Sequence, residues 1–242
     1  MLWAAIVNFD IRILHWLNAF VGRSPHFDKI IEYLNHTQLR YAVIVCFCWW
    51  CWFRDTDTSA RAQARRHLLR TFAAGIVAIF VARLLALTLP FRVRPRFEPA
   101  LHFVASDPYS TDLIDWSSFP SDHAVMFTAL AVGLCFVSWR AGLLALLYTV
   151  LIIDLPRIYL GIHYPTDIIA GLVLGAVISY AMNVVSVFDG LTNWALRWER
   201  ESPGVFYAAL FFVTLEFSTM FESVRELATQ VTTLADYLTR SR

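Results

Sequence analysis

The sequence predicts an all-α fold, a multi-pass membrane helix bundle of about six spans. Of its 242 residues, 58% are hydrophobic and only 16% are charged. The mean hydropathy of +0.54 is higher than that of ordinary soluble domains. Several apolar runs approach the roughly 20 residues that a helix needs to cross a bilayer. Few long polar segments remain to build a soluble core, so we expect one membrane-embedded domain.

The expected transmembrane domain covers residues 39–221. Its first apolar run is short and ends with Trp49, Trp50 and Trp52, which is typical of the aromatic belt at a membrane interface. The six expected spans are residues 39–53, 69–90, 121–139, 143–160, 166–187 and 204–221.

Residues 1–38 are expected to form N-terminal interfacial helices. The first 21 residues are apolar but contain Asp10, Arg12 and His15 near their centre. A full span would bury all three, so a helix lying in the membrane interface costs less free energy. A second short amphipathic helix, about residues 27–36, is expected to follow.

Residues 222–242 predict a C-terminal amphipathic helix, because apolar residues recur at steps of three and four. This helix would lie on the membrane or on the bundle, and the sequence leaves a coiled-coil homodimer open. The net charge of +1 and the lack of a basic patch interleaved with aromatic residues favour no nucleic-acid partner.

The order of the spans divides the loops between two sides of the membrane. Loops 91–120 and 160–166 must lie on one side. Loops 54–68, 139–142 and 188–203 must lie on the other. Short arginine-bearing loops tend to be cytoplasmic. The second set of loops contains Arg54, Arg61, Arg65, Arg66, Arg140, Arg197 and Arg200. We therefore expect a protein of the inner (cytoplasmic) membrane whose loops 91–120 and 160–166 face the periplasm.

The segment from Leu155 to Asp167 has the composition of a catalytic site at a membrane boundary. Arg157 presents a planar guanidinium that suits phosphate oxygens. His163 can act as a nucleophile or shuttle protons, and Asp167, four residues later, can orient it.

Two further stretches are expected on the same face. Arg92 to Arg96 contains three arginines in five residues. Ser121 and Asp122 open an apolar helix, whose N-terminus can bind an anion. His123 follows directly and is available to protonate a leaving oxygen.

Together these groups fit phosphoryl transfer through a histidine nucleophile. The sequence contains no nucleotide P-loop and no cluster with zinc-ligand spacing, so we expect no metal and no cofactor. Each motif alone has a simpler explanation: Pro-Ser-Asp before an apolar run is usually a helix cap, and an arginine beside a proline at a membrane edge is usually an anchor.

The three stretches resemble the signature motifs of the type 2 phosphatidic acid phosphatase (PAP2) superfamily, which are Lys-x6-Arg-Pro, Pro-Ser-Gly-His and Ser-Arg-x5-His-x3-Asp. The matching residues are Arg94 and Pro95, then Pro120, Ser121 and His123, then Arg157, His163 and Asp167.

The resemblance implies a metal-independent lipid phosphatase. His163 would form a phosphohistidine, Asp167 would support it, and His123 would protonate the leaving group. Arg94, Arg157 and Ser121 would bind the phosphate.

The sequence departs from the family motifs at three positions. Leu87 stands where the first motif has lysine, and either Arg92 or Arg83 could replace it; Arg92 is the stronger candidate. Asp122 replaces glycine beside the phosphate site, as in members that act on polyprenyl diphosphates. Pro156 replaces serine and is expected to bend the end of the fourth span.

The expected substrate is a polyprenyl diphosphate such as undecaprenyl diphosphate, cleaved to the monophosphate. A phosphatase for phosphatidate or phosphatidylglycerol phosphate, or a lipid phosphotransferase of the same family, is the main alternative. Asp154, Arg83 and Glu216 at membrane depth would suit a transporter. The missing lysine at Leu87 would suit a non-catalytic scaffold.

Overall fold

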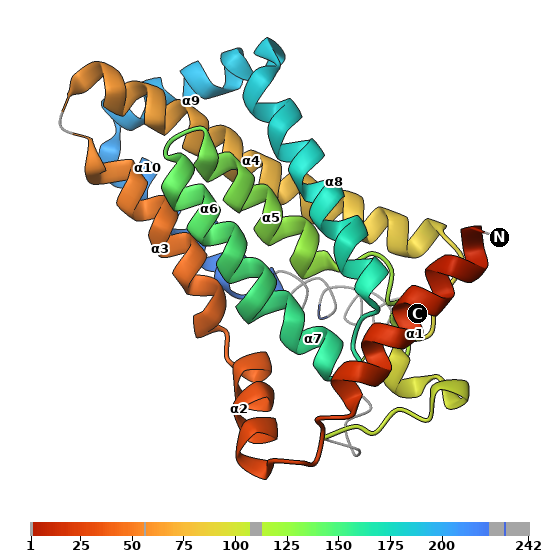
Figure 1. The fold of residues 1–242 in the computed structure, drawn as a ribbon. Helices are drawn as coiled ribbons and strands as arrows, with labels where there is room; N and C mark the ends of the chain where they lie inside the picture. Colours follow the sequence, from red (N-terminus) through yellow and green to blue (C-terminus); the bar gives the residue numbers. More distant parts are fainter. Residues whose placement is uncertain (1, 56, 107–112, 223–229, 231–242) are drawn as a thin grey trace, which may run out of the picture.

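The computed structural model describes residues 2–55, 57–106, 113–222 and 230, and every regular element in them is helical (Figure 1). The predicted all-α class is therefore confirmed. The α-helices are α1 (Leu2–Asn18), α2 (Pro25–His36), α3 (Leu39–Arg54), α4 (Thr58–Thr88), α5 (Asp122–Cys135), α6 (Trp139–Tyr148), α7 (Leu155–Tyr159), α8 (Pro165–Val184), α9 (Asp189–Glu201) and α10 (Pro203–Ser218).

Helix α5 is the centre of the bundle. It packs against α4, α6 and α8, and ten of its 14 residues are buried. Figure 1 shows α4, α6 and α8 arranged around it. Because α5 is apolar all round, it needs neighbours on every face.

Two glycines let α8 lie close to α5. A Cβ at Gly171 would come within 2.7 Å of the Ala124 Cβ, and a Cβ at Gly175 would overlap the carbonyl group of Val125. Small residues four positions apart are a usual means of close helix packing in membranes. This contact brings the N-termini of α5 and α8 together. The second motif lies at the start of α5, and the third motif ends in the first turn of α8.

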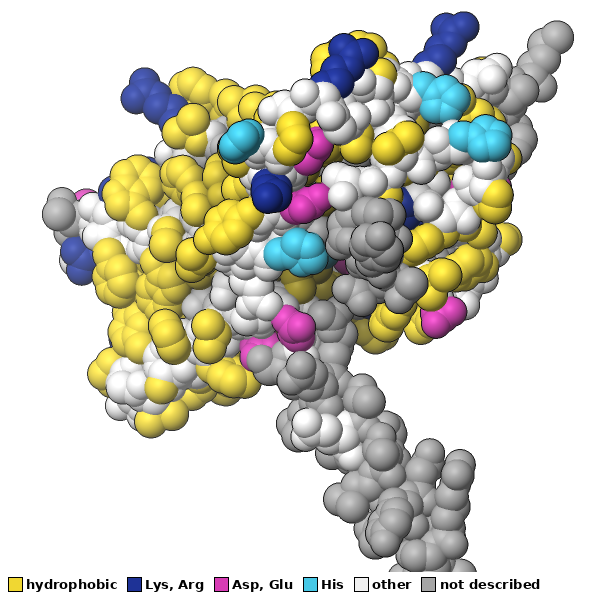
Figure 2. Space-filling view, turned by 90° about the horizontal axis from the view of Figure 1, so that it is seen from below, with side chains coloured by type: hydrophobic (Ala, Val, Ile, Leu, Met, Phe, Trp, Pro, Cys, Tyr) yellow, Lys and Arg dark blue, Asp and Glu magenta, His cyan; other side chains and the backbone are white. Residues whose placement is uncertain are grey.

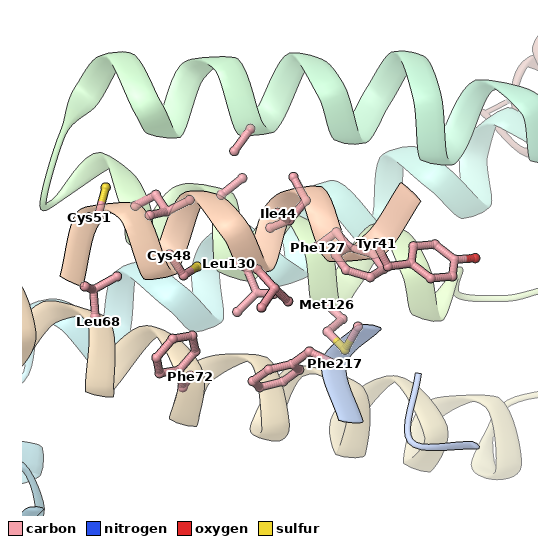
Figure 3. Close-up of a cluster of buried hydrophobic side chains, with 14 of the residues drawn as sticks. Tyr41, Ile44, Cys48, Cys51, Leu68, Phe72, Met126, Phe127, Leu130 and Phe217 are labelled. Carbon is pink, nitrogen blue, oxygen red and sulfur yellow. The ribbon is translucent and has the colours of Figure 1, made fainter. Parts of the chain in front are cut away.

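The largest hydrophobic cluster lies where α3, α4, α5 and α10 meet (Figure 3). Tyr41 lies at one end of this cluster and Cys51 near the other. The labelled members are Tyr41, Ile44, Cys48, Cys51, Leu68, Phe72, Met126, Phe127, Leu130 and Phe217.

Three helical stretches of the described residues are long and apolar enough to cross a membrane. They are α4, the run Trp139–Tyr159 and α8. The run Trp139–Tyr159 joins α6 to α7 through one π-helical turn, Thr149–Asp154. The apolar helices α5 and α10 are shorter, and α3 has 16 residues. The six-span arrangement stays a prediction.

Two predicted loops are wrong. The loop expected at 54–68 is helical from Thr58, because Asp57 caps α4 by accepting a hydrogen bond from the Ala60 amide at 2.8 Å. The connection expected at 188–203 contains the amphipathic helix α9, which packs against α4 and α10. Helix propensity and packing therefore override the high polarity of both segments.

The predicted N-terminal helices are present as α1 and α2, which contact the bundle at α7 and α8. Helix α1 does not leave all of its charged residues at the surface, because Asp10 is only 1% exposed. The C-terminal helix predicted for residues 222–242 lies almost entirely outside the described residues.

Candidate active site

The three motif segments meet at one end of the bundle. Figure 2 looks at this end and shows charged and histidine side chains gathered on its surface, with apolar side chains along the margins. The segment with His163 connects α7 to α8 and turns at Gly161, whose φ is +66°. A side chain there would also collide with the ring of Phe103, so this sharp turn requires glycine.

His163 is buried and held in one orientation. Its Nδ1 lies 2.8 Å from the carbonyl oxygen of Ser118. A carbonyl oxygen only accepts hydrogen bonds, so Nδ1 carries the proton and the lone pair is on Nε2. The nitrogen with the free lone pair is therefore Nε2, which lies 3.4 Å from Nη1 of Arg94.

The environment keeps His163 neutral. Burial lowers the pKa of His163 well below its usual value of 6.5, and the positive charges of Arg157 and Arg94 lower it further. A neutral imidazole is the nucleophilic form, so this site holds His163 ready to attack at neutral pH.

Asp167 supports His163 through charge more than through a direct hydrogen bond. Its Oδ2 lies 3.7 Å from His163 Nδ1. The same oxygen accepts a 2.8 Å hydrogen bond from the amide of Tyr164, which caps the first turn of α8. The carboxylate is therefore fixed beside the imidazole and can stabilise positive charge that develops there.

Arg94 is anchored by the backbone and still has a donor to spare. Its guanidinium donates to the carbonyl oxygens of Trp116 at 3.0 Å, Ile162 at 2.9 Å and Ser117 at 3.2 Å. A guanidinium has five N–H donors, and a fourth one faces Nε2 of His163, so one remains for an anion. Burial first, and then Arg157, lowers the pKa of Arg94 to about 10, which leaves it charged at neutral pH.

The second histidine has a similar partner. His123 lies in the first turn of α5, and its Nε2 lies 3.4 Å from Nη1 of Arg157. Each histidine thus has a guanidinium nitrogen 3.4 Å from its Nε2. The carbonyl oxygen of Arg157 accepts from the amides of Ile162 and His163, which fixes the turn between Arg157 and His163.

Ser121 is buried at the junction of α5 and α8. Its hydroxyl caps α5 by accepting from the Ala124 amide at 3.4 Å, and its own amide donates to the Asp167 carbonyl oxygen at 3.3 Å. A serine hydroxyl can still donate its hydrogen to a phosphate while it accepts a cap hydrogen bond.

The charge of Asp122 is balanced by Arg83. Their side chains form an ion pair at 2.5 Å, and the Arg83 guanidinium lies 4.7 Å from the centre of the Trp116 ring. Leu87, the position of the family lysine, is 83% exposed. Arg83, one helical turn earlier, is therefore the basic residue that α4 supplies to this end of the bundle.

Arg92 binds carboxylates. It forms ion pairs with Asp167 and, at 2.7 Å, with Asp10, and it donates to the Thr166 hydroxyl at 3.0 Å. Its guanidinium also lies 3.9 Å from the centre of the Tyr164 ring. The phosphate contact expected of Arg92 competes with these interactions, and this arrangement favours a role in holding Asp167.

Asp10 is the site residue that the motif analysis missed. It lies 75 or more positions from the three motifs, and its neighbours in sequence give no catalytic signal. The signal that sequence alone offered was a carboxylate near the centre of an apolar helix, where a charge requires a partner.

The fold and the site define a helical protein in which two guanidiniums flank two histidines at one end of the bundle. Comparison with known proteins agrees. The family model of the PAP2 superfamily matches residues 76–189, which include Arg94, His123 and His163. Residues 76–189 are therefore similar to the domain that defines the PAP2 superfamily.

Two curated relatives cover most of the chain. The undecaprenyl-diphosphatase BcrC of Bacillus subtilis is 28% identical over 178 residues, which are 72% of this chain and 81% of BcrC. The putative undecaprenyl-diphosphatase YbjG of Escherichia coli is 27% identical over 200 residues, 77% of this chain and 90% of YbjG.

A third relative matches a shorter part of the chain. The undecaprenyl-diphosphatase of Sulfolobus acidocaldarius is 35% identical over 78 residues, 31% of this chain and 34% of that protein. No solved structure matches the chain significantly.

Proposed function

We propose that this protein is an integral-membrane phosphatase that hydrolyses a polyprenyl diphosphate, such as undecaprenyl diphosphate, to the monophosphate through a phosphohistidine at His163. The observation that supports this best is the pairing of each histidine Nε2 with a guanidinium nitrogen at 3.4 Å. The family and the names of the relatives support a lipid phosphatase.

In the first step, Nε2 of His163 attacks the outer phosphorus atom. A phosphorus–nitrogen bond forms, and the bond to the bridging oxygen breaks. Arg94 and Arg157 stabilise the charge on the transferred phosphoryl group. The carbonyl oxygen of Ser118 and the nearby carboxylate of Asp167 stabilise the positive imidazole ring that the attack creates.

His123 moves the protons. In the free site its Nε2 faces the guanidinium of Arg157, which only donates, so this nitrogen is unprotonated. The negative charge of a bound diphosphate favours the protonated ring. The protonated ring then donates to the bridging oxygen, which leaves as part of the lipid monophosphate. It then accepts a proton from the water that attacks the phosphohistidine. This second attack releases inorganic phosphate and restores neutral His163, so the complete cycle consumes one water molecule.

The surface of the bundle suits a lipid environment. Three helical stretches are long and apolar enough to cross a membrane. The exposed face of α8 is apolar for about four turns, as expected of a lipid-facing helix. This face consists of Ile169, Val173, Val177, Tyr180 and Val184.

The distribution of arginines supports an orientation in the inner membrane. Helices α4 and α9 meet at the end of the bundle opposite the site (Figure 1). One pocket there is lined by Arg61, Arg65, Arg66, Arg197 and Arg200. Because arginine-rich segments that flank the spans tend to remain in the cytoplasm, the histidine site would face the periplasm.

We also propose that the reaction is metal-independent. In the described part of the chain, no group of three or more His, Cys, Asp or Glu side chains is arranged to bind a metal ion. The arginines supply the positive charge that a metal ion provides in other phosphatases.

Phosphate release from undecaprenyl diphosphate and from phosphatidate, with EDTA present, tests the proposal. Purified protein should release phosphate faster from the diphosphate, and His163→Ala should abolish release. His26→Ala, which changes an exposed histidine of α2, is the matched control and should retain activity. Full activity of His163→Ala would refute the mechanism.

A further inference from the structure

A buried arginine near the site is not used by the reaction described above. Arg40 lies in the first turn of α3 and is only 3% exposed. Its Nη2 donates to the carbonyl oxygen of Asn35 at 2.6 Å and to the hydroxyl of Tyr41. Its Nε and Nη1 are buried and have no hydrogen-bond partner among the described residues. Buried donors without acceptors are costly, so these atoms indicate a missing anion or water.

Arg40 and His123 contact the same aromatic ring. The Arg40 guanidinium carbon lies 4.6 Å from the centre of the Tyr41 ring, and the His123 ring lies 5.2 Å from it. Phe127 stacks on Tyr41 at 4.9 Å and fixes the ring in place. Figure 3 shows the Tyr41 hydroxyl pointing away from the cluster, at the end opposite Cys51.

Further unpartnered atoms surround the same region. Nε of Arg157 is buried without a hydrogen-bond partner in the described chain, and so are both carboxylate oxygens of Asp154. The carboxylate of Asp154 interacts electrostatically with both Arg157 and Arg40, and the interaction with Arg157 is the stronger one. Two buried guanidiniums and one buried carboxylate leave a net positive charge, which attracts an anion.

The π-helical turn contributes to this arrangement. Asp154 is the last residue of the turn Thr149–Asp154, and Arg157 follows three positions later, just after Pro156. π-Helical turns often occur at functional sites, because they redirect the side chains that follow. Helix α3 packs against this turn and against α5, which brings Arg40 to it.

We propose that Arg40, together with Arg157, binds the inner phosphate of a diphosphate substrate, the group that leaves with the lipid. This inference rests on the proposed function. The outer phosphate lies against His163 and Arg94, and the bridging oxygen lies against His123. The inner phosphate, bonded to that oxygen, then extends past His123 toward Tyr41 and Arg40.

This subsite would distinguish diphosphates from phosphate monoesters. When His163 takes the outer phosphoryl group, the electrons of the broken bond pass to the bridging oxygen, which receives a proton from His123. Arg40 stabilises the monophosphate that leaves. A phosphate monoester has no inner phosphate, so Arg40 should contribute little to its hydrolysis. Arg40 is therefore a specificity residue for diphosphates.

Hydrolysis of farnesyl diphosphate and farnesyl monophosphate by the same purified protein tests the inference. Arg40→Gln should lower kcat/KM for the diphosphate by about 10- to 100-fold, as expected for a lost hydrogen bond to a charged group. Its kcat/KM for the monophosphate should change by less than about 3-fold, and Arg40→Lys should be intermediate. Arg54→Gln, at the other end of α3, is the matched control.

A second measurement does not depend on turnover of the monophosphate. Methylenediphosphonate and inorganic phosphate should both inhibit competitively. In Arg40→Gln, the inhibition constant of methylenediphosphonate should rise more than that of inorganic phosphate. Thermal unfolding of each variant identifies a folding defect. Arg40→Lys provides the same comparisons if Arg40→Gln does not fold.

Equal losses on both farnesyl substrates with an unchanged inhibitor ratio would make Arg40 a structural residue and overturn the inference. An unchanged preference in a folded variant would also overturn it. If the wild-type protein released phosphate from neither substrate, the proposed function would fail, which is a different result.

Discussion

The backbone amide of Thr166 donates a 2.9 Å hydrogen bond to the carboxylate of Asp10. The Thr166 hydroxyl donates to the same carboxylate at 2.6 Å. Helix α1 is therefore bound to the first turn of α8, one residue before Asp167. Arg92 connects the two carboxylates by an ion pair to each. The N-terminal helix thus helps to position the group that supports the nucleophile.

Removal of the Asp10 carboxylate should damage catalysis from outside the motifs. We expect Asp10→Ala to lower the free energy of unfolding by about 1–3 kcal/mol, because it leaves a buried amide unpaired. It should lower kcat by about 10-fold with little change in KM, because Asp167 is displaced while the phosphate ligands remain. Steady-state kinetics and thermal unfolding measure both effects. Arg12→Ala, at an exposed position of α1, should be neutral.

Arg92 and Arg94 should have different kinetic roles although they are two residues apart. Arg92→Met removes a partner of Asp167 and should lower kcat with a small effect on KM. Arg94→Lys keeps the charge but loses the fork of donors, so it should weaken inhibition by inorganic phosphate by about 10-fold. If Arg92→Met weakened phosphate inhibition as strongly as Arg94→Lys, Arg92 would be a phosphate ligand as the sequence first suggested.

The close contact between α5 and α8 should be sensitive to a single methyl group. Gly175→Ala places a Cβ against the carbonyl group of Val125 and should destabilise the protein by about 1–3 kcal/mol, as overpacking does. Activity should fall as well, since the N-termini of both helices carry site residues. Gly190→Ala is the control, because a Cβ there meets nothing within 4 Å. A stable, fully active Gly175→Ala variant would contradict this account of the helix contact.

The depressed pKa of His163 predicts a pH dependence of stability. In the unfolded chain, His163 takes up a proton as the pH falls through about 6.5, whereas the buried ring stays neutral until a lower pH. The unfolded state then binds more protons, so the free energy of unfolding falls as the pH is lowered from 7.5 toward 5.

His163→Gln should lose this contribution. Melting temperatures of the two proteins between pH 7.5 and 5 test the effect, and the decline should be shallower in the variant. Parallel curves would show that His163 has an ordinary pKa in the folded protein.

Much of the site follows from local sequence and from the order of the spans. The spacing of Arg157, His163 and Asp167 places them around a single turn between two helices. The number of intervening spans then puts this turn on the same side as Arg94 and His123. Apolar runs define the bundle, because a helix that is apolar on all sides requires burial or lipid.

Other features depend on contacts that local sequence does not encode. Arg92 was a candidate phosphate ligand because it lies beside Arg94, but two carboxylates from distant helices compete for it. The arginines of residues 58–68 predict a polar loop, but the segment is helical. In the folded chain, Arg65 of this helix pairs with Glu199 of α9, which removes the cost of its charge.

The hydrogen bond between Asp10 and Thr166 joins residues 156 positions apart. During synthesis, the first helix leaves the ribosome long before its partner exists. The Asp10 carboxylate lacks its Thr166 partner until α8 has been made, so every earlier stage of the nascent chain lacks the complete proposed site. The proposed site is therefore complete only after the whole bundle around α5 has formed.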